Sequence, residues 1–350
     1  AAPAMDRFSY LIRRLLLAVP TFLGITLVCF ALTRVLPGGP VEMRLARLRG
    51  LGSGEGGGVA AERVAAVTEE QRQALTRQFG FDQPFLKQYV RWLLRDAMGL
   101  RMRSYDFPDR SAGELIASRF PVSLWFGITG FVLAYLVCIP LGMAKALRHG
   151  TRFDAVTSVI VFVGYALPPF ALGMLLKMLF CGTVDSLWNI FPLGGFESPD
   201  AVTLGPWARF LDRAWHMALP VTCYVAGNFA MLTLLMKNSL LEQISADYVR
   251  TVLAKGATPR RALWGHAFRN AMIPIATGFG GILSLLFAGS VIIERVFEIP
   301  GMGRLSLEAI TGRDYAVFMA ILAVTSTLQL AGNLLSDFCY MLIDPRIHFG

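Results

Sequence analysis

The sequence predicts an all-α integral membrane protein with six transmembrane helices. Of its 350 residues, 55% are hydrophobic and only 16% are charged, and its mean hydropathy is +0.53. Soluble domains are less apolar than this. Six stretches without charged residues are each long enough, at roughly 20 residues, to cross a bilayer core about 30 Å thick as a helix. These stretches are 15–32, 121–144, 155–176, 217–236, 270–293 and 315–336.

Basic residues around these stretches set the expected orientation. An excess of Lys and Arg in short loops marks the cytoplasmic side of a membrane protein. If the N-terminus is inside, the inner segments hold Arg7, Arg13, Arg14, Lys145, Arg148, Arg152, Lys237, Arg250, Lys255, Arg260, Arg261, Arg269 and Arg346. The two short outer connections then hold only Arg209, Arg213, Arg295, Arg304 and Arg313. We therefore expect both termini on the cytoplasmic side of the membrane, with stretch 15–32 kept as an uncleaved anchor.

Four regions follow along the chain. Residues 5–36 are expected to form the first transmembrane helix and 37–119 a periplasmic insert between the first and second helices. Residues 120–343 form the core domain of five further transmembrane helices, and 344–350 a cytoplasmic tail. The core domain includes a polar loop over 242–266 between the fourth and fifth helices.

The periplasmic insert is expected to be helical, with a glycine-rich tip over 50–58. Thr68-Glu-Glu-Gln71 is a capping-box pattern that begins one helix. A second helix is predicted over 85–98, with Phe85, Tyr89, Leu93 and Met98 on one face. This insert could pack on the membrane helices as a cap, dock a partner, or do both.

The polar loop carries the most specific local pattern. A short helix is predicted to start at Asp247, which would cap it, and to end at Lys255 with Gly256 in the left-handed conformation. Thr258 as N-cap and Pro259 at the first helical position begin another helix. We call this helix–turn–helix the elbow.

The first helix of the elbow is amphipathic although it lies outside the membrane. Tyr248, Val249, Val252 and Leu253 recur at spacings of three and four residues and form an apolar stripe. Something must cover that stripe. A docking helix is one reading, and a helix lying on anionic lipid is the other.

The sequence shows no energy source for transport. It lacks the G-x-x-x-x-G-K-[ST] phosphate loop. The charged residues nearest to the spans, Lys177, Glu294 and Asp337, are expected at the membrane interfaces, so no mid-membrane site for a coupling ion is predicted. Five cysteines and four histidines are scattered without ligand spacing or pairing. We therefore expect no catalytic residue, no metal and no cofactor on this chain.

Weakly polar residues and helix breakers are expected near mid-depth. They would line a translocation pathway or tie the helices together by hydrogen bonds. Pro168-Pro169 removes two backbone donors from the third span, and Gly278-Phe-Gly-Gly281 could act as a hinge in the fifth. The candidate pathway residues are Tyr165, Pro168, Pro169, Asn228, Ser284 and Gln329.

Seven short motifs occur along the chain: Tyr10-Leu-Ile-Arg-Arg-Leu-Leu16, Leu36-Pro-Gly-Gly-Pro40, Ile139-Pro-Leu-Gly142, Asp247-Tyr-Val-Arg-Thr251, Ala254-Lys-Gly256, Arg269-Asn-Ala271 and Asp344-Pro-Arg-Ile347. They resemble the membrane-spanning subunits of ATP-binding-cassette (ABC) peptide importers of the oligopeptide and dipeptide type. The chain is most similar to the Yej-type permeases in its glycine-rich stretch and in Tyr165-Ala-Leu-Pro168, Leu235-Met-Lys-Asn-Ser239 and Trp264-Gly-His-Ala-Phe-Arg-Asn270. In importers of other cargo, Glu-Ala-Ala begins six residues before the glycine that corresponds to Gly256. This chain carries Arg250-Thr-Val252 at that position.

The resemblance implies a bacterial inner-membrane protein with a type I importer permease fold, in which the elbow helix inserts into a partner ATPase. The implied coupling residues are Asp247, Tyr248, Arg250, Thr251, Ala254, Lys255 and Gly256. The implied partners are a second permease subunit, one fused or two separate ATPase chains that bind ATP and Mg, a periplasmic peptide-binding protein, a peptide substrate and membrane lipid. Peptide–nucleotide antibiotics of the microcin C type are a further cargo that the resemblance implies.

Two alternative functions agree less well with the sequence. One is a carrier or channel driven by an ion gradient, which the absence of mid-membrane charge argues against. The other is a membrane enzyme or scaffold, which the unpaired histidines argue against. A net charge of +9 does not indicate nucleic-acid binding here, because much of it is needed for topology and no basic stripe interleaved with aromatic residues occurs.

Overall fold

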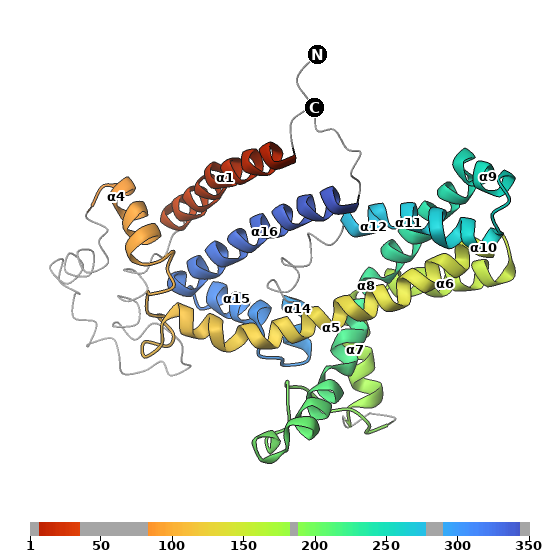
Figure 1. The fold of residues 1–350 in the computed structure, drawn as a ribbon. Coiled ribbons are helices and arrows are strands. Elements are labelled where there is room, and N and C mark those ends of the chain that lie inside the picture. Colours follow the sequence, from red (N-terminus) through yellow and green to blue (C-terminus); the bar gives the residue numbers. More distant parts are fainter. Residues whose placement is uncertain (1–6, 36–82, 183–187, 278–289, 344–350) are drawn as a thin grey trace, which may run out of the picture. The chain divides into compact units, whose positions relative to one another are not determined.

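The structure is a computed structural model that describes residues 7–35, 83–182, 188–277 and 290–343 (Figure 1). Within this part, the chain is helical and contains only isolated β-bridges rather than strands. The described residues divide into two compact units. The first unit comprises the parts of the described chain within 7–17, 119–304 and 328–343, and the second comprises those within 18–118 and 305–327.

The helices have the following bounds, with the labels of Figure 1. The α-helices are α1 (Arg7–Val35), α4 (Phe85–Val90), α5 (Ala112–Leu147), α6 (Arg152–Ala166), α7 (Pro169–Phe180), α8 (Pro206–Ser245), α9 (Asp247–Ala254), α10 (Pro259–Ala262), α11 (Phe268–Ala271), α12 (Ile273–Thr277), α14 (Val291–Val296), α15 (Met302–Thr311) and α16 (Tyr315–Ile343). Two π-helical turns, η1 (Arg91–Arg95) and η3 (Leu263–Ala267), and a 3₁₀ turn, η2 (Ala201–Thr203), connect them.

Long apolar helices account for most of the predicted spans. Among the described residues, three segments can each cross a membrane: Ile12–Ala31 of α1, α5, and Tyr315–Phe338 of α16. Two bent pairs raise the number to five if each pair is one span: α6 with α7, and the two halves of α8. The predicted span 270–293 lies partly outside the described residues, as does Gly278–Gly281. The count of six therefore stays a prediction.

The third predicted span is not one continuous helix, which agrees with the disturbance expected from Pro168 and Pro169. It is broken between α6 and α7, which meet at an angle of 96°. Leu167 and Pro168 at the break both have extended backbones, and Pro169 begins α7. A proline lacks the backbone donor and disfavours helical geometry in the residue before it, which explains why the helix stops here.

Apolar side chains from α5, α7, α8 and α14 form one core of the first unit. Phe126, Met217, Cys223 and Phe297 are among its buried members. The thiols of Cys138, Cys181 and Cys223 are free and buried. These cysteines therefore serve as small core residues, as expected from their scattered positions.

The second unit is built around an aromatic cluster. Phe30 of α1 packs against Tyr89 of α4 and Trp92 of η1, together with Met319 and Ala323 of α16. The helix predicted over 85–98 is shorter than expected, because α4 passes into the π-helical turn η1 and Met98 has a positive φ of 58°. Trp92 was not predicted on the buried face of this helix, but it is one of the buried residues of the aromatic cluster. Residues 50–58 and 68–71 lie outside the described residues.

Candidate functional site

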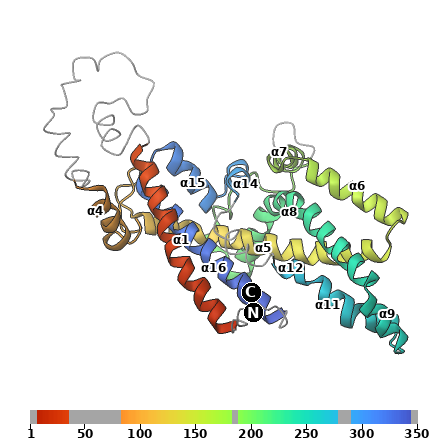
Figure 2. The same cartoon turned by 90° about the horizontal axis from the view of Figure 1, so that it is seen from above.

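The elbow forms at the end of α8. Ala246 has an extended backbone and is the N-cap of α9, so the prediction that Asp247 caps this helix was wrong by one residue. Asp247 instead occupies the first helical turn, where its negative charge still suits the positive end of the helix dipole. In Figures 1 and 2, α9 lies at the far end of α8, and it contacts α10 and η3.

The end of α9 and the start of the next helix have the predicted geometry. Lys255 is the C-cap, and Gly256 has φ of +86°. The backbone N–H of Gly256 donates to the carbonyl of Leu253 at 2.9 Å. Thr258 caps α10, because its hydroxyl accepts the backbone N–H of Arg261 at 3.3 Å, and Pro259 is the first helical residue. The chain therefore makes a sharp, locally determined turn at this point.

Most of the apolar stripe of α9 is covered by this chain itself. Val249 is 6% exposed and packs with Met236 and Leu240 of α8 and with Ala262 and Ala267 of the following turns. Tyr248 and Val252 are partly buried on the same core, and the Tyr248 hydroxyl donates to Gln243 Oε1 at 2.8 Å. Leu253 remains 41% exposed. α9 is thus fixed to α8 through one shared core.

The outward face of the elbow is polar. Of the seven residues that the resemblance assigns to ATPase coupling, Tyr248 is the one that is partly buried. The exposed six are Asp247, Arg250, Thr251, Ala254, Lys255 and Gly256. Arg250 and Asp247 lie 3.8 Å apart as a solvated pair on this face, and such pairs contribute little to stability. The face is therefore available to another molecule.

A buried ion cluster links α8 to α5 and α6 near the elbow. Lys237 Nζ of α8 donates to both carboxylate oxygens of Asp154 at 2.8 Å. Lys145 Nζ of α5 is fully buried, lies 3.1 Å from Asp154 Oδ1 and donates to Ser158 Oγ at 2.7 Å. His149 Nδ1 lies 3.3 Å from Asp154 Oδ2. We call Lys145, Asp154 and Lys237 the ion cluster.

Sequence reasoning missed the ion cluster because it counted both lysines only as topology signals. Lys237 is 83 positions from its carboxylate partner in the sequence. The available signal was weak: two lysines and one acidic residue, each at an end of a predicted span. Because two ammonium groups share one carboxylate, the cluster holds three helices in one arrangement by strong hydrogen bonds between charged groups.

The candidate pathway residues are only partly brought together. Tyr165, Pro168 and Pro169 are exposed at the break between α6 and α7. A Cβ atom added to Gly227 of α8 would lie 3.3 Å from Pro169 Cγ, so the α8 backbone passes close to this break next to Asn228. Gln329 lies on α16 and donates to Asn333 Oδ1 at 3.1 Å. Ser284 lies outside the described residues.

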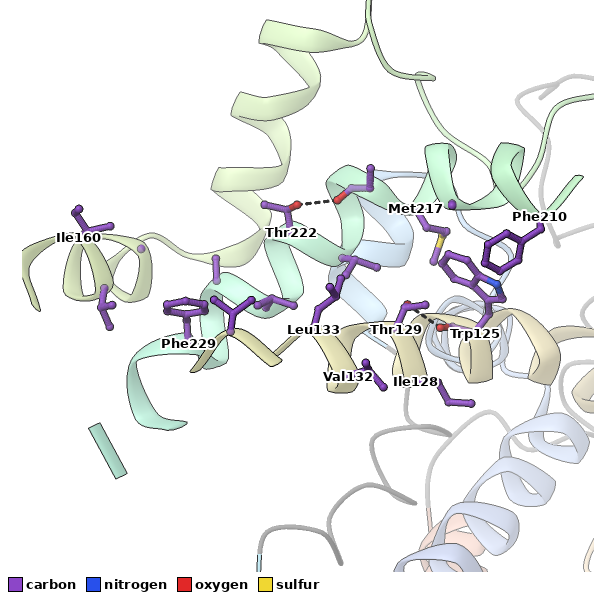
Figure 3. A pocket seen from close by; sticks show the side chains of 18 residues that line it. Trp125, Ile128, Thr129, Val132, Leu133, Ile160, Phe210, Met217, Thr222 and Phe229 are labelled. Atoms are coloured by element: carbon purple, nitrogen blue, oxygen red, sulfur yellow. Dashed lines mark hydrogen bonds between the residues drawn. The ribbon is translucent and has the colours of Figure 1, made fainter. Parts of the chain in front are cut away.

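An apolar cavity of about 910 Å³ lies between α5, α6 and α8, within the first unit (Figure 3). Trp125, Leu133, Ile160 and Phe229 are among its lining residues, and no ionisable residue lines it in the described part of the chain. The hydroxyls of Thr129 and Thr222 in its wall donate to carbonyls of their own helices. The described lining of the cavity therefore offers no group for acid–base chemistry.

The three charged residues expected at the interfaces all have partners. Lys177 Nζ donates to the carbonyl of Val296 at 2.9 Å. Glu294 is almost fully buried and accepts the backbone N–H of Arg304 at 2.7 Å. Asp337 pairs with Arg14 at 3.0 Å. These charges hold the fold together.

A partly buried ion network stabilises the connection before α8. Glu197 accepts hydrogen bonds from Arg209 at 2.9 and 3.0 Å and from Arg213 at 2.9 Å. The hydrogen bond from Arg209, opposed by partial burial and supported by Arg213, lowers the pKa of Glu197 to about 2.

Within the described residues, no group of His, Cys, Asp and Glu side chains could hold a metal ion.

Comparison with known proteins identifies the class. Residues 137–349 match the family described as "Binding-protein-dependent transport system inner membrane component", and this chain belongs to that family. It is therefore a multi-pass inner-membrane permease subunit. This confirms the resemblance to ABC permeases and the all-α membrane fold.

Relatives extend the match to nearly the whole chain. The chain is 37% identical to the "Peptidoglycan transport system permease protein YejB" of Agrobacterium fabrum, over 97% of this chain and 98% of the relative. It is also 37% identical to the "Inner membrane ABC transporter permease protein YejB" of Escherichia coli O157:H7, over 97% and 99%. The "Dipeptide transport system permease protein DppB" of Escherichia coli K12 is 32% identical over 97% and 98%.

Proposed function

We propose that this chain is the membrane permease subunit of an ATP-driven importer of oligopeptides. The observation that carries the proposal is the elbow: a capped, glycine-terminated helix whose inner face is fixed to α8 and whose outer face is polar and exposed. Such a helix can receive force from a partner and pass it to a membrane helix. The names of the relatives, which include peptide transport systems, support oligopeptides as the cargo class.

The proposed mechanism begins outside the membrane. A loaded binding protein docks on the outer connections, and ATP-driven closure of partner ATPase domains then pushes α9. Because Val249 shares a core with Met236 and Leu240, α8 must move with α9. The ion cluster passes this movement to α5 and α6. The break between α6 and α7 gives the bundle a place to bend, so the pathway opens to the other side.

Partner subunits would supply the functions that this chain lacks. ATP and Mg would be bound by the partner ATPase, as one fused chain or two, and this chain would bind no cofactor. A second permease subunit would complete the pathway, and both termini would be cytoplasmic. In this assignment Asp247, Arg250, Thr251, Ala254, Lys255 and Gly256 face the ATPase, and Tyr165, Pro168, Pro169, Asn228, Ser284 and Gln329 are the pathway candidates.

One relative favours a more specific cargo. The Agrobacterium fabrum protein is named as part of a peptidoglycan transport system, so peptide fragments of peptidoglycan are a second candidate cargo. Peptide–nucleotide antibiotics of the microcin C type are a third, which rests on the resemblance to Yej-type permeases.

Uptake by cells tests the proposal. Cells that lack the chain should lose uptake of a labelled tetrapeptide, of a peptidoglycan-derived peptide, or of both, and expression of the chain should restore it. Affinity purification from those cells should yield an ATPase and a second permease. If the purified chain alone takes up peptide in proteoliposomes under a proton or sodium gradient, it is a gradient-driven carrier and the proposal is wrong.

A further inference from the structure

The helix that runs from α4 through η1 has two different faces, and only one of them is packed against other described residues. Its inner face lies against α1, because the Tyr89 hydroxyl forms a hydrogen bond with Thr26 Oγ1 at 2.8 Å and also donates to the carbonyl of Leu23 at 3.2 Å. The Phe30 ring lies 5.6 Å from Trp92, centroid to centroid. All these residues belong to the second unit, and Figure 1 shows α4 beside the C-terminal end of α1.

These contacts fix the depth of the helix relative to α1. The apolar span of α1 runs from Ile12 to Ala31. Thr26 lies five residues and Leu23 eight residues before its end, which places Tyr89 roughly 7–12 Å below that end at about 1.5 Å of rise per residue. Interfacial amphipathic helices insert their apolar face about 5–10 Å below the headgroups. The α4–η1 helix therefore lies at the depth of the headgroup and acyl boundary.

The outer face has the composition that this depth requires. Leu86, Val90 and Leu94 recur every four residues and are 66%, 49% and 73% exposed. A parallel row of exposed cations lies beside them: Lys87, Arg91 and Arg95. These six side chains, with Gln83, line one shallow hollow of about 540 Å³. We call this surface the basic–apolar face.

The exposed side chains of α1 at this depth are apolar as well. Leu23, Ile25 and Val28 of the same span are themselves 38–58% exposed and apolar. A water-soluble protein that covered the basic–apolar face at this depth would have to enter the bilayer. Lipid reaches it without any such step, and cationic side chains at this level can extend to headgroup phosphates.

We propose that the basic–apolar face of α4–η1 is a binding surface for anionic phospholipid, in the leaflet at the C-terminal end of α1. Leu86, Val90 and Leu94 lie among the first acyl carbons, and Lys87, Arg91 and Arg95 bind the phosphates. This inference goes beyond the transport function and does not depend on an ATPase.

Photo-crosslinking in cells tests the inference. The full chain carries Leu94→benzoylphenylalanine, and the adducts formed on irradiation are identified by mass spectrometry after purification. The expected result is phospholipid adducts, with phosphatidylglycerol enriched several-fold over its share of the membrane extract. Val28→benzoylphenylalanine, on the exposed side of α1, is the lipid-facing control, and Asp109→benzoylphenylalanine, in a polar exposed loop, is the aqueous control.

The charge is tested separately. Replacing Lys87, Arg91 and Arg95 together by Gln should keep the lipid adducts at position 94 but reduce the phosphatidylglycerol share to that of the whole membrane. Adducts at Val28 should not change, which shows that the variant is folded and inserted. Adducts of position 94 only with another protein, or only with other residues of this chain, would overturn the proposal, as would the absence of phosphatidylglycerol enrichment.

Discussion

At the residue scale, Gly256 has a role that its backbone geometry explains. Its φ of +86° lies in the left-handed region, and no atom lies within 4 Å of where a Cβ would stand. A side chain therefore fits in space but strains the backbone, at a cost of about 1–3 kcal/mol for a residue other than glycine. The glycine is required by the turn and not by close packing.

The first prediction concerns this turn. Gly256→Val should lower peptide uptake and stimulation of ATP hydrolysis by the binding protein, while leaving the amount of inserted chain unchanged. Gly256→Asn should be milder, because Asn tolerates the left-handed region better than a β-branched residue. Uptake in cells and ATPase activity of the purified complex measure the effect. Uptake by the valine variant equal to wild type would contradict this role.

The second prediction concerns the ion cluster. Lys237→Met leaves Lys145 and Asp154 as a one-to-one pair, so the protein should fold, but the link from α8 to α6 is lost. We expect several-fold lower uptake at nearly unchanged thermal stability, and recovery of uptake in Lys237→Arg. Asp154→Asn should be far more damaging, because it leaves two ammonium groups without a counter-ion, at a cost of about 3–5 kcal/mol.

The measurements for this cluster are uptake and the ratio of transported peptide to hydrolysed ATP, together with thermal unfolding of the purified complex. If the cluster had only a structural role, Lys237→Met would lower the unfolding temperature and leave the ratio of transported peptide to hydrolysed ATP constant. If Lys237→Met transports as well as wild type, α8 does not pass its movement through Asp154.

Local signals predicted the residues of the elbow, and long-range contacts escaped prediction. Gly256, Thr258 and Pro259 were predictable because each acts on its own backbone. The start of α9 at Asp247 was predicted correctly, but the N-cap is Ala246 and not Asp247. Asp154 was missed because its role depends on Lys237, far away in the sequence, which only the packing of α6 on α8 brings near.

At the element scale, the connection before α8 is fastened by charge. Glu197 is bound by Arg209 and Arg213, which lie in the first turns of α8. The pKa of Glu197 falls to about 2, from an ordinary value of 4.5. A lowered pKa means that the folded state favours the ionised carboxylate, so this stabilisation is full above pH 4.5 and is lost as the pH falls toward 2.

The third prediction follows from the lowered pKa of Glu197. Glu197→Gln should lower the thermal stability of the purified complex at pH 7, and the difference from wild type should shrink as the pH falls below 4.5. The effect at pH 7 should be modest, because these side chains are partly solvated. Unfolding midpoints at pH 7, 5, 4 and 3 measure it. A difference that stays constant over this range would show that the carboxylate charge is not what fastens the connection.

Elements were predicted well where apolar length decided them and less well where backbone breaks did. The predicted spans of α1, α5, α8 and α16 are all helical, because long apolar runs leave few alternatives. The sequence Pro168-Pro169 predicted a disturbed helix, but it did not predict the bend of 96°. The π-helical turn η1, which makes Trp92 a core residue, has no local sequence signal.

At the scale of the whole molecule, composition alone established a multi-pass membrane protein, and family membership agrees with it. The two units could not be predicted, because α1, α5, α15 and α16 each contribute to both of them. Such a division depends on which parts of one helix pack together, and that information is absent from the pattern of a single span.

The central claim is that a partner ATPase drives transport through α9. Ala254→benzoylphenylalanine places a photoreactive group on the exposed face of this helix in transporting cells. The account predicts adducts between this chain and an ATPase subunit, in a yield that changes when ATP is depleted. Adducts with phospholipid headgroups alone, with and without ATP, would contradict it.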